Sequence, residues 1–208
     1  MNAYMQNEIY KELVREFGEK PLESLDLERI DKLEYLNGVI MEVARLHAAI
    51  PGAEPRVISK EGSFTVELAN GEKVSLPKGT IVSVQPWTIH NDEAIFARPE
   101  QFRPERWIKD SDETDEEFKT RYQMMRYRLF TFGHGNRMCL GMNVALIEMK
   151  LVVAQLYWRF KSRVSSTWCT KLSEESAKMG YSTFDLNSPT NSLSDVELMS
   201  MADSYTSR

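Results

Sequence analysis

The 208-residue sequence lacks three features that would each assign it to a broad class of protein. It has only two cysteines, Cys139 and Cys169, and no Cys-x-x-Cys pair, so no disulfide framework is expected. This cysteine usage predicts a reducing, intracellular compartment. No apolar run is long enough to span a bilayer, and residues 1–20 read as a polar helix rather than a signal peptide. The net charge of −5 argues against a nucleic-acid partner. The sequence therefore predicts a globular chain with no membrane segment, export signal or nucleic-acid surface of its own.

Hydrophobic periodicity predicts a mainly helical chain. A first amphipathic helix is expected over residues 4–17 and a stronger one over residues 32–47, where Asp31 is predicted as the N-cap and Glu34 completes a capping box. A surface helix is expected to follow the acidic stretch 110–117 and to end near Tyr127, and another helix to cover residues 140–160. The apolar stripes of the three amphipathic helices are expected to be Ile9, Leu13 and Phe17; Leu33, Leu36, Ile40 and Val43; and Leu146, Met149, Val153 and Leu156.

Strand character is confined to the middle of the chain. Residues 63–68 and 81–87 are rich in β-branched and aromatic residues, and Asn70-Gly71 gives a turn signal between the first strand and a short second one. These segments predict one small antiparallel sheet. Residues 90–110 are expected to form an ordered loop, and residues 170–195 to be irregular. The fold class is therefore mainly α with a small antiparallel β-sheet, in a single domain over residues 1–208.

The stretch Phe130–Lys150, FTFGHGNRMCLGMNVALIEMK, holds the one cysteine with an unusual neighbourhood. Cys139 lies just before a predicted helix start, where free amides and the helix dipole favour a thiolate. Gly133, Gly135 and Gly141 allow close approach of a flat or bulky group, and Arg137 adds a positive charge. These residues suit an axial thiolate ligand to haem iron. A small buried cysteine remains open as an alternative.

Two other kinds of site are less well supported by the same stretch. A zinc site lacks a second ligand at ligand spacing, because His134 stands alone. A phosphate loop lacks the Gly-Lys-Ser/Thr ending. His90 and His134 are expected to form hydrogen bonds within loops rather than to ligate metal, and Cys169 is expected to be inert.

The full spacing of this stretch resembles a known family signature. Five residues spell F-x-x-G-x-R-x-C-x-G, the haem-binding motif of the cytochrome P450 monooxygenases, namely Phe132, Gly135, Arg137, Cys139 and Gly141. The resemblance implies haem as cofactor, with Cys139 as the axial iron ligand and Phe132 shielding the thiolate. It implies that Arg137 and, further upstream, Arg56 pair with the haem propionates.

Two upstream segments resemble the family in the family's order. Glu42 and Arg45 form an E-x-x-R pair three residues apart on one helix face, and residues 102–107, FRPERW, are similar to the P-E-R-F-type motif. The resemblance implies that Arg106 bridges to Glu42 and Arg45. It assigns to this triad the structural task of holding the cysteine loop in place.

The resemblance extends from about Ile9 to Arg208 but implies only the proximal, carboxy-terminal half of a family member. The distal helix motif Ala/Gly-Gly-x-Asp/Glu-Thr is absent from the 208 residues. Residues 196–208 resemble the segment that leads into the last β-hairpin, which is expected to be missing. Segments 50–56 and 182–191 are the remaining candidates for lining a substrate pocket.

The function implied is that of a haem-thiolate monooxygenase, which inserts one oxygen atom of O₂ into a small organic substrate with electrons from a reductase. The alternative is a catalytically inactive haem-binding or interaction fragment, from a truncated gene model or a degraded gene copy. A full-length relative would be anchored to the endoplasmic reticulum membrane. The cations before the cysteine loop form a candidate reductase-docking surface or, equally, a solvated helix face: Lys119, Arg121, Arg126 and Arg128.

Overall fold

The structure is a computed structural model that describes residues 3–19, 26–59, 63–164 and 196–200. The expectations for segments 170–195 and 182–191 and for Cys169 lie outside these ranges. In chain order the elements are α1 (Ala3–Phe17), α2 (Leu27–Ile30), α3 (Glu34–Leu46), β1 (Glu54–Val57), β2 (Ser63–Glu67), β3 (Lys73–Pro77), β4 (Ile81–Val84), α4 (Pro86–His90), η1 (Pro104–Trp107), α5 (Asp115–Arg128), η2 (Gly135–Arg137), α6 (Met142–Arg159), β5 (Phe160–Val164) and β6 (Val196–Ser200). The fold is mainly helical with small antiparallel sheets, in agreement with the predicted class.

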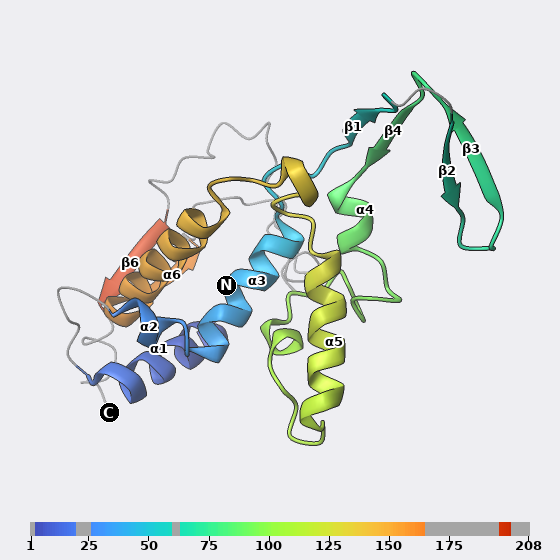
Figure 1. Ribbon diagram of the computed structural model, residues 1–208. Helices are drawn as coiled ribbons and strands as arrows, with labels where there is room; N and C mark the ends of the chain where they lie inside the picture. The colour runs from blue at the N-terminus through green and yellow to red at the C-terminus, as the bar shows by residue number, and fades with distance from the viewer. Residues whose placement is uncertain (1–2, 20–25, 60–62, 165–195, 201–208) are drawn as a thin grey trace.

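Helix α3 is the central element of the helical part (Figure 1). On one side α1, α2 and α6 pack around it, and on the other side η1 and α5 do. The first side holds the main apolar core, which is made of the following buried residues: Ile9, Leu13, Ile30, Leu33, Leu36, Val39, Ile40, Ala154, Tyr157 and Trp158. Most of the predicted stripe residues thus face this core, and Phe17 packs against its edge.

One residue of the predicted α3 stripe is not buried. Val43 is 37% exposed, so its assignment to the core was wrong. Along the last turn of α3 the buried face is polar: Glu42 and Arg45 are 0% and 1% exposed, while Ala44 is also buried. The periodicity of apolar residues missed this because a charged pair that is satisfied by partners replaces apolar packing there.

The amino-terminal end of α3 is capped from another helix rather than by its own flanking residues. The predicted Asp31 cap was wrong: Asp31 is the C-cap of α2, and Leu33 stands at the N-cap of α3 without a side-chain hydrogen bond. Instead, Glu12 of α1 accepts the free backbone N–H groups of Tyr35 and Leu36 on its two carboxylate oxygens, both at 3.0 Å. Burial raises the pKa of Glu12 although these two bonds favour its charged form. Glu12 is more than 20 residues from the helix start that it caps, so a search for capping residues next to α3 in the sequence does not find it.

The strands form separate two-stranded ribbons rather than the predicted single sheet. β2 and β3 pair through the expected Asn70-Gly71 turn, but β4 pairs antiparallel with β1, a strand that the sequence did not indicate. The predicted strand 81–87 ends at Val84, because Pro86 begins α4. Proline is tolerated at this first helical position because the backbone N–H that it lacks would have no partner within the helix. Both ribbons extend away from the helices (Figure 1), and β6 returns to pair with β5.

Helix α3 and η1 approach each other closely at Gly38. A Cβ atom at this buried position would lie 2.7 Å from the carbonyl oxygen of Pro104. The absence of a side chain therefore lets η1 lie directly on α3, which brings the segment after Pro104 to the buried face of that helix. Among the helices in the described ranges, none is long and apolar enough to cross a membrane.

Candidate functional site

A buried polar network joins α3 to the segment around η1. Glu42 accepts hydrogen bonds from both Arg45 and Arg106: Arg45 Nη2 and Arg106 Nε lie 2.8 Å and 2.9 Å from Oε1, and Arg45 Nε lies 3.1 Å from Oε2. The three residues predicted to meet as a triad therefore do meet in the structure. All of them are buried, with Arg106 the most exposed at 7%.

Further donors complete the environment of the Glu42 carboxylate. Trp107 Nε1 donates to Oε2 at 2.9 Å, and the backbone N–H of Arg103 donates to Oε1 at 3.0 Å. Burial alone would raise the pKa of Glu42, but the hydrogen bonds and positive charges of Arg45 and Arg106 outweigh it and lower that pKa. The carboxylate is thus held ionised between two guanidinium groups, which is the arrangement in which a buried charge is tolerated.

The two guanidinium groups also bind backbone carbonyls of the loop that precedes η1. Arg106 donates to the carbonyl oxygens of Ala97, Arg98 and Gln101, and Arg45 donates to that of Gln101 at 3.3 Å. This loop has no regular secondary structure to satisfy its carbonyls, so the arginines replace the missing ladder of hydrogen bonds. The loop predicted over residues 90–110 is thus only partly one: it is irregular between α4 and η1, where the arginines bond to its carbonyls, but η1 is a short 3-10 helix that the sequence did not predict.

His90 is a second buried polar residue at this network. It is 0% exposed, its Nδ1 lies 2.7 Å from the carbonyl oxygen of Arg45, and its Nε2 accepts the backbone N–H of Phe130 at 2.8 Å. Burial, together with the nearby positive charge of Arg45, lowers the pKa of His90 to about 4. The prediction that it forms hydrogen bonds is confirmed, but it lies buried at the carboxyl end of α4 rather than in a loop, which no sequence pattern indicated.

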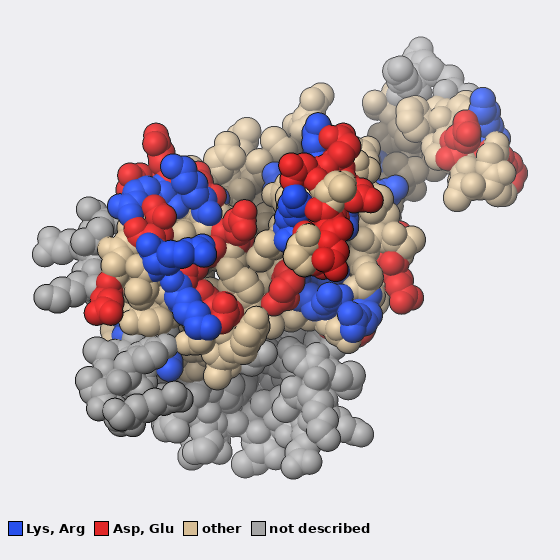
Figure 2. Space-filling view, turned by 90° about the horizontal axis from the view of Figure 1, so that it is seen from below, with Lys and Arg blue, Asp and Glu red and all other residues tan. Residues whose placement is uncertain are grey.

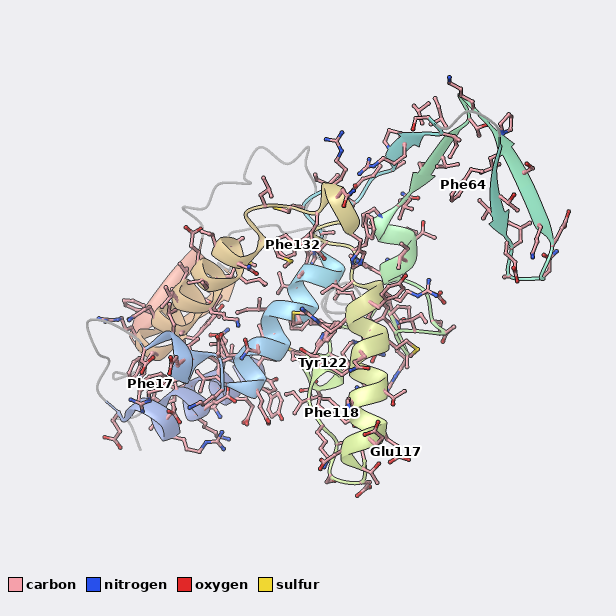
Figure 3. All side chains as sticks on the ribbon, in the orientation of Figure 1. Phe17, Phe64, Glu117, Phe118, Tyr122 and Phe132 are labelled. Carbon is pink, nitrogen blue, oxygen red and sulfur yellow. The ribbon has the colours of Figure 1, made fainter. Side chains whose placement is uncertain are left out.

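The cysteine loop, residues 130–141, is anchored at its start. Thr131 Oγ1 donates to the carbonyl oxygen of Ala44 at 2.6 Å, which ties the loop to the carboxyl end of α3. The backbone N–H of Cys139 donates to the carbonyl oxygen of Phe132 at 2.8 Å, which closes the loop on itself. Figure 3 places Phe132 on this loop near the end of α3, while Phe64 lies on the outlying β2–β3 hairpin. His134 packs between two rings, with its ring centre 5.8 Å from that of Tyr127 and 5.1 Å from that of Phe130, and it forms no hydrogen bond with a residue that the structure describes, contrary to the prediction.

The backbone of the loop uses its glycines in two ways. Gly133 and Gly135 have φ angles of 70° and 67°, a region that residues with a side chain rarely adopt. Gly141 is the N-cap of α6, and a Cβ atom there would lie 3.9 Å from Cys139 Sγ. Cys139 itself is exposed and lies just before α6, as the sequence predicted.

The two predicted propionate arginines lie in different settings. Arg137 is exposed at the end of η2, two residues before Cys139, and forms no ion pair with any residue that the structure describes. Arg56 is exposed on β1, where its polar contacts are with its own strand: Nη1 donates to the carbonyl oxygen of Pro55 at 2.8 Å, and Nη2 lies 3.5 Å from Glu54. Arg137 therefore lies in the cysteine loop, two residues from Cys139, whereas the polar contacts of Arg56 are with β1 and not with that loop.

The four cations proposed for partner docking are not equivalent. Arg121 is engaged with the protein itself: it pairs with Glu113 at 2.7 Å and donates to the carbonyl oxygens of Arg106 and Ile108. Arg126 and Arg128 are exposed near the end of α5. On the face shown in Figure 2, acidic and basic side chains are interspersed, without a broad field of one sign over the described residues.

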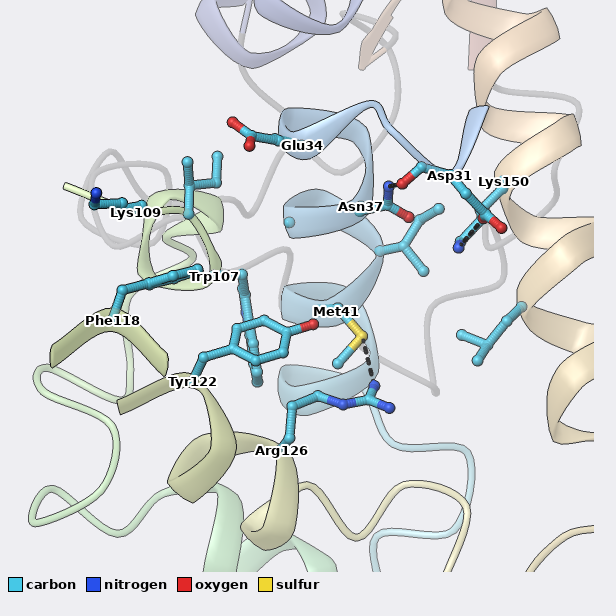
Figure 4. Close-up of a pocket in the computed structure, with 14 residues that line it drawn as sticks. Asp31, Glu34, Asn37, Met41, Trp107, Lys109, Phe118, Tyr122, Arg126 and Lys150 are labelled. Atoms are coloured by element: carbon cyan, nitrogen blue, oxygen red, sulfur yellow. Dashed lines mark hydrogen bonds and ion pairs between the residues drawn. The ribbon is translucent and has the colours of Figure 1, made fainter. Parts of the chain in front are cut away.

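A cavity of about 400 Å³ lies between α3, η1, α5 and α6 (Figure 4). Its walls combine the aromatic side chains of Trp107, Phe118 and Tyr122 with Arg126, which contacts Met41 Sδ at 3.5 Å. No residue of the cysteine loop lines it. The cavity is therefore separate from the candidate cysteine site.

Comparisons with known proteins point to one family. Residues 2–185 match the family described as Cytochrome P450. Over 137 residues, or 66% of the chain, it is 39% identical to "Cytochrome P450 monooxygenase astB" of Talaromyces wortmannii, and over 156 residues, or 75% of the chain, it is 33% identical to "Cytochrome P450 3A12" of Canis lupus familiaris.

A third relative has a name that bears on activity. Over 155 residues, or 73% of the chain, the sequence is 34% identical to "Inactive cytochrome P450 monooxygenase cloA" of Claviceps fusiformis. The matches span 25% of the length of the Talaromyces protein and 27% of the other two, so the chain corresponds to about a quarter of these relatives. The family match over most of the sequence and the geometry of its motifs lead to one conclusion: the chain belongs to the cytochrome P450 monooxygenase family.

Proposed function

We propose that this chain is the proximal part of a haem-thiolate monooxygenase and that Cys139 is the axial ligand of the haem iron. The observation that carries the proposal is the exposed thiol at the start of α6, on a loop that is hydrogen-bonded to α3 at one end and to itself at the other. A ligand residue must be both accessible and held in position, and Cys139 meets both conditions.

The residues around Cys139 fit haem. The side chains of Met138, Leu140 and Val144, which flank the thiol in the chain, are 43%, 103% and 59% exposed. Neighbouring exposed apolar side chains are typical of a binding surface, and a porphyrin plane is a flat apolar partner. Gly141 leaves the space 3.9 Å from the thiol free of a Cβ atom.

Each remaining residue of the motif has a task that follows from its position. Arg137 offers a free cation beside the thiol for an anionic propionate, whereas Arg56 would have to release its contact with Glu54 to do the same. Phe132 shields the thiolate from water, and the Glu42–Arg45–Arg106 network holds the segment against which the loop is built. When haem is bound, a thiolate ligand donates electron density to the iron and favours cleavage of the O–O bond.

The activity proposed for the whole protein is insertion of one atom of O₂ into a small organic substrate, with the second atom leaving as water. Electrons would come from a reductase that docks at the exposed Arg126 and Arg128, and not at Arg121, which the fold already uses. Reversing the charge of Arg126 and Arg128 should slow reduction of the haem at low salt. An unchanged rate would remove this docking site from the proposal.

The test of the ligand is spectroscopic. The chain is supplied with haem, reduced, and exposed to carbon monoxide, and thiolate ligation is expected to give a strongly red-shifted Soret band. Cys139→Ala should abolish that band, while Cys169→Ala, the matched control at the other cysteine, should retain it. A band that survives in Cys139→Ala would exclude Cys139 as the ligand.

A second candidate is a haem-binding member without monooxygenase activity. One observation favours it: the similarity to a relative whose name describes it as inactive. The two candidates separate in one experiment, because both predict the red-shifted band but only the first predicts product formation when reductase and O₂ are supplied.

A further inference from the structure

We propose that His90 is the residue through which the buried Glu42–Arg45–Arg106 network positions the cysteine loop. The claim that His90 helps to hold an iron ligand rests on the proposed function of Cys139. The claim that His90 holds the loop does not depend on that function. The hydrogen bonds of His90 are with Arg45 and Phe130 and not with Cys139, so it is a positioning residue rather than a catalytic one.

The two ring nitrogens of His90 are assigned to different partners by hydrogen-bond chemistry. The backbone N–H of Phe130 can only donate, so Nε2, at 2.8 Å, must accept and carries no proton. The carbonyl oxygen of Arg45 can only accept, so Nδ1, at 2.7 Å, carries the proton and donates. The ring is therefore neutral, in one tautomer, and has no nitrogen left for a metal ion.

The main chain of His90 is tied to the same arginine as its ring. Arg45 Nη1 donates to the carbonyl oxygen of His90 at 2.8 Å, while the ring donates to the carbonyl oxygen of Arg45. This reciprocal pair fixes both the position of the residue and the rotation of its ring. Since Arg45 is itself fixed by Glu42, the direction in which Nε2 points is set by the buried network.

The acceptor Nε2 points at the first of three consecutive anchored residues. Phe130 donates its N–H to His90, Thr131 donates its hydroxyl to the carbonyl oxygen of Ala44, and Phe132 accepts the N–H of Cys139. The loop thus has an outer anchor at α4, a second anchor at α3, and a bond to the cysteine itself. Loss of the outer anchor would free residue 130 and loosen the segment to which Cys139 is bonded.

Two substitutions at His90 separate shape from hydrogen bonding. His90→Phe keeps a ring of similar size but removes both the donor and the acceptor. His90→Gln places one amide N–H donor and one carbonyl acceptor at the end of a side chain of similar reach, and so can serve both partners. Thr88→Ala is the control on the same helix, because its hydroxyl bonds only to the exposed Gln85 side chain.

The first measurement is amide hydrogen exchange in the haem-free chain. In His90→Phe the protection of the Phe130 amide should fall by about tenfold or more, while the amide of Leu13 in α1 keeps its protection. His90→Gln should restore most of the Phe130 protection, and Thr88→Ala should leave it unchanged. The proposal is overturned if Phe130 is as protected in His90→Phe as in the wild type, or if Leu13 loses protection to the same extent, which would indicate general destabilisation only.

The second measurement uses the haem-loaded, reduced, carbon monoxide-bound chain. At equal haem content, His90→Phe should lose its red-shifted thiolate band several-fold faster than the wild type and the His90→Gln variant. Equal lifetimes would show that the anchor does not position Cys139. If the wild type takes up no haem, the proposed function fails, while the exchange experiment still decides whether His90 holds the loop.

Discussion

Replacing Glu42 with glutamine is expected to lower the free energy of unfolding by about 3–5 kcal/mol, because it leaves two buried guanidinium groups without a counter-charge. The Glu42 carboxylate accepts five hydrogen bonds, which come from Arg45 Nε and Nη2, Arg103 N, Arg106 Nε and Trp107 Nε1. Glutamine has the same shape but carries an oxygen on only one of the two positions. Its amide nitrogen must therefore face donors at the other position.

The magnitude follows from the less costly of the two orientations. If the glutamine oxygen keeps the three bonds at Oε1, its nitrogen replaces Oε2 and opposes Arg45 Nε and Trp107 Nε1. Each buried donor left without an acceptor costs roughly 1–3 kcal/mol. Two of them agree with the roughly 3–5 kcal/mol measured when one member of a buried ion pair is removed. Against a typical domain stability of about 5–15 kcal/mol, most of the margin is lost.

The assay is urea unfolding followed by circular dichroism, with Glu8→Gln as the matched control. Glu8 forms an ion pair with Lys11 at 2.8 Å on the surface of α1, and removing it should change stability by less than about 1 kcal/mol. The reasoning about the buried network is refuted if Glu42→Gln and Glu8→Gln unfold at the same urea concentration. A change of slope without a change of midpoint would instead indicate that the variant exposes a different amount of surface on unfolding.

Two further predictions concern buried positions near this network. Gly38→Ala should lower the free energy of unfolding, because overpacking against the Pro104 carbonyl costs about 1–3 kcal/mol and the gain in helix propensity, about 1 kcal/mol, offsets this only in part. Gly52→Ala is the control, because a Cβ atom there would have no atom within 4 Å, and it should not be destabilised. Equal melting temperatures of the two variants would contradict this prediction. Burial holds the pKa of His90 below its usual 6.5, at about 4, so its contribution to stability is complete above pH 6.5 and is lost as pH falls toward 4, by at most about 3 kcal/mol. His90→Gln should flatten that slope in a pH series of urea unfolding, and an unchanged slope would assign it to other groups.

The features that the sequence predicted correctly are those encoded locally. The helices α1 and α6 follow from apolar residues at helical spacing, and the surface helix expected near the acidic stretch is α5, which begins within that stretch at Asp115 and ends at Arg128. The cysteine motif is also local, because its residues lie within ten positions of one another. Such signals depend on neighbours along the chain and can be read without knowing the fold.

The errors concern contacts between distant segments. The α3 cap comes from Glu12 on another helix, and the partner of β4 is β1 rather than the adjacent hairpin. His90 follows the same rule: its burial depends on α3 and on the cysteine loop, neither of which adjoins it in sequence. Only tertiary packing creates these contacts, and a single sequence contains no spacing that reports them.

The way the core is assembled has a consequence for how the chain folds. Trp158 of α6 packs against Phe17, with ring centres 5.5 Å apart, and donates to the carbonyl oxygen of Gly18, 140 residues earlier. Contacts between segments so far apart in sequence slow folding, because the chain loses the entropy of closing a long loop before these contacts can form. During synthesis, α1 and α3 leave the ribosome before α6, so the apolar faces that α6 covers stay exposed to solvent until α6 has been made. A chaperone that shields those two faces until residue 158 has left the ribosome should therefore raise the yield of folded protein.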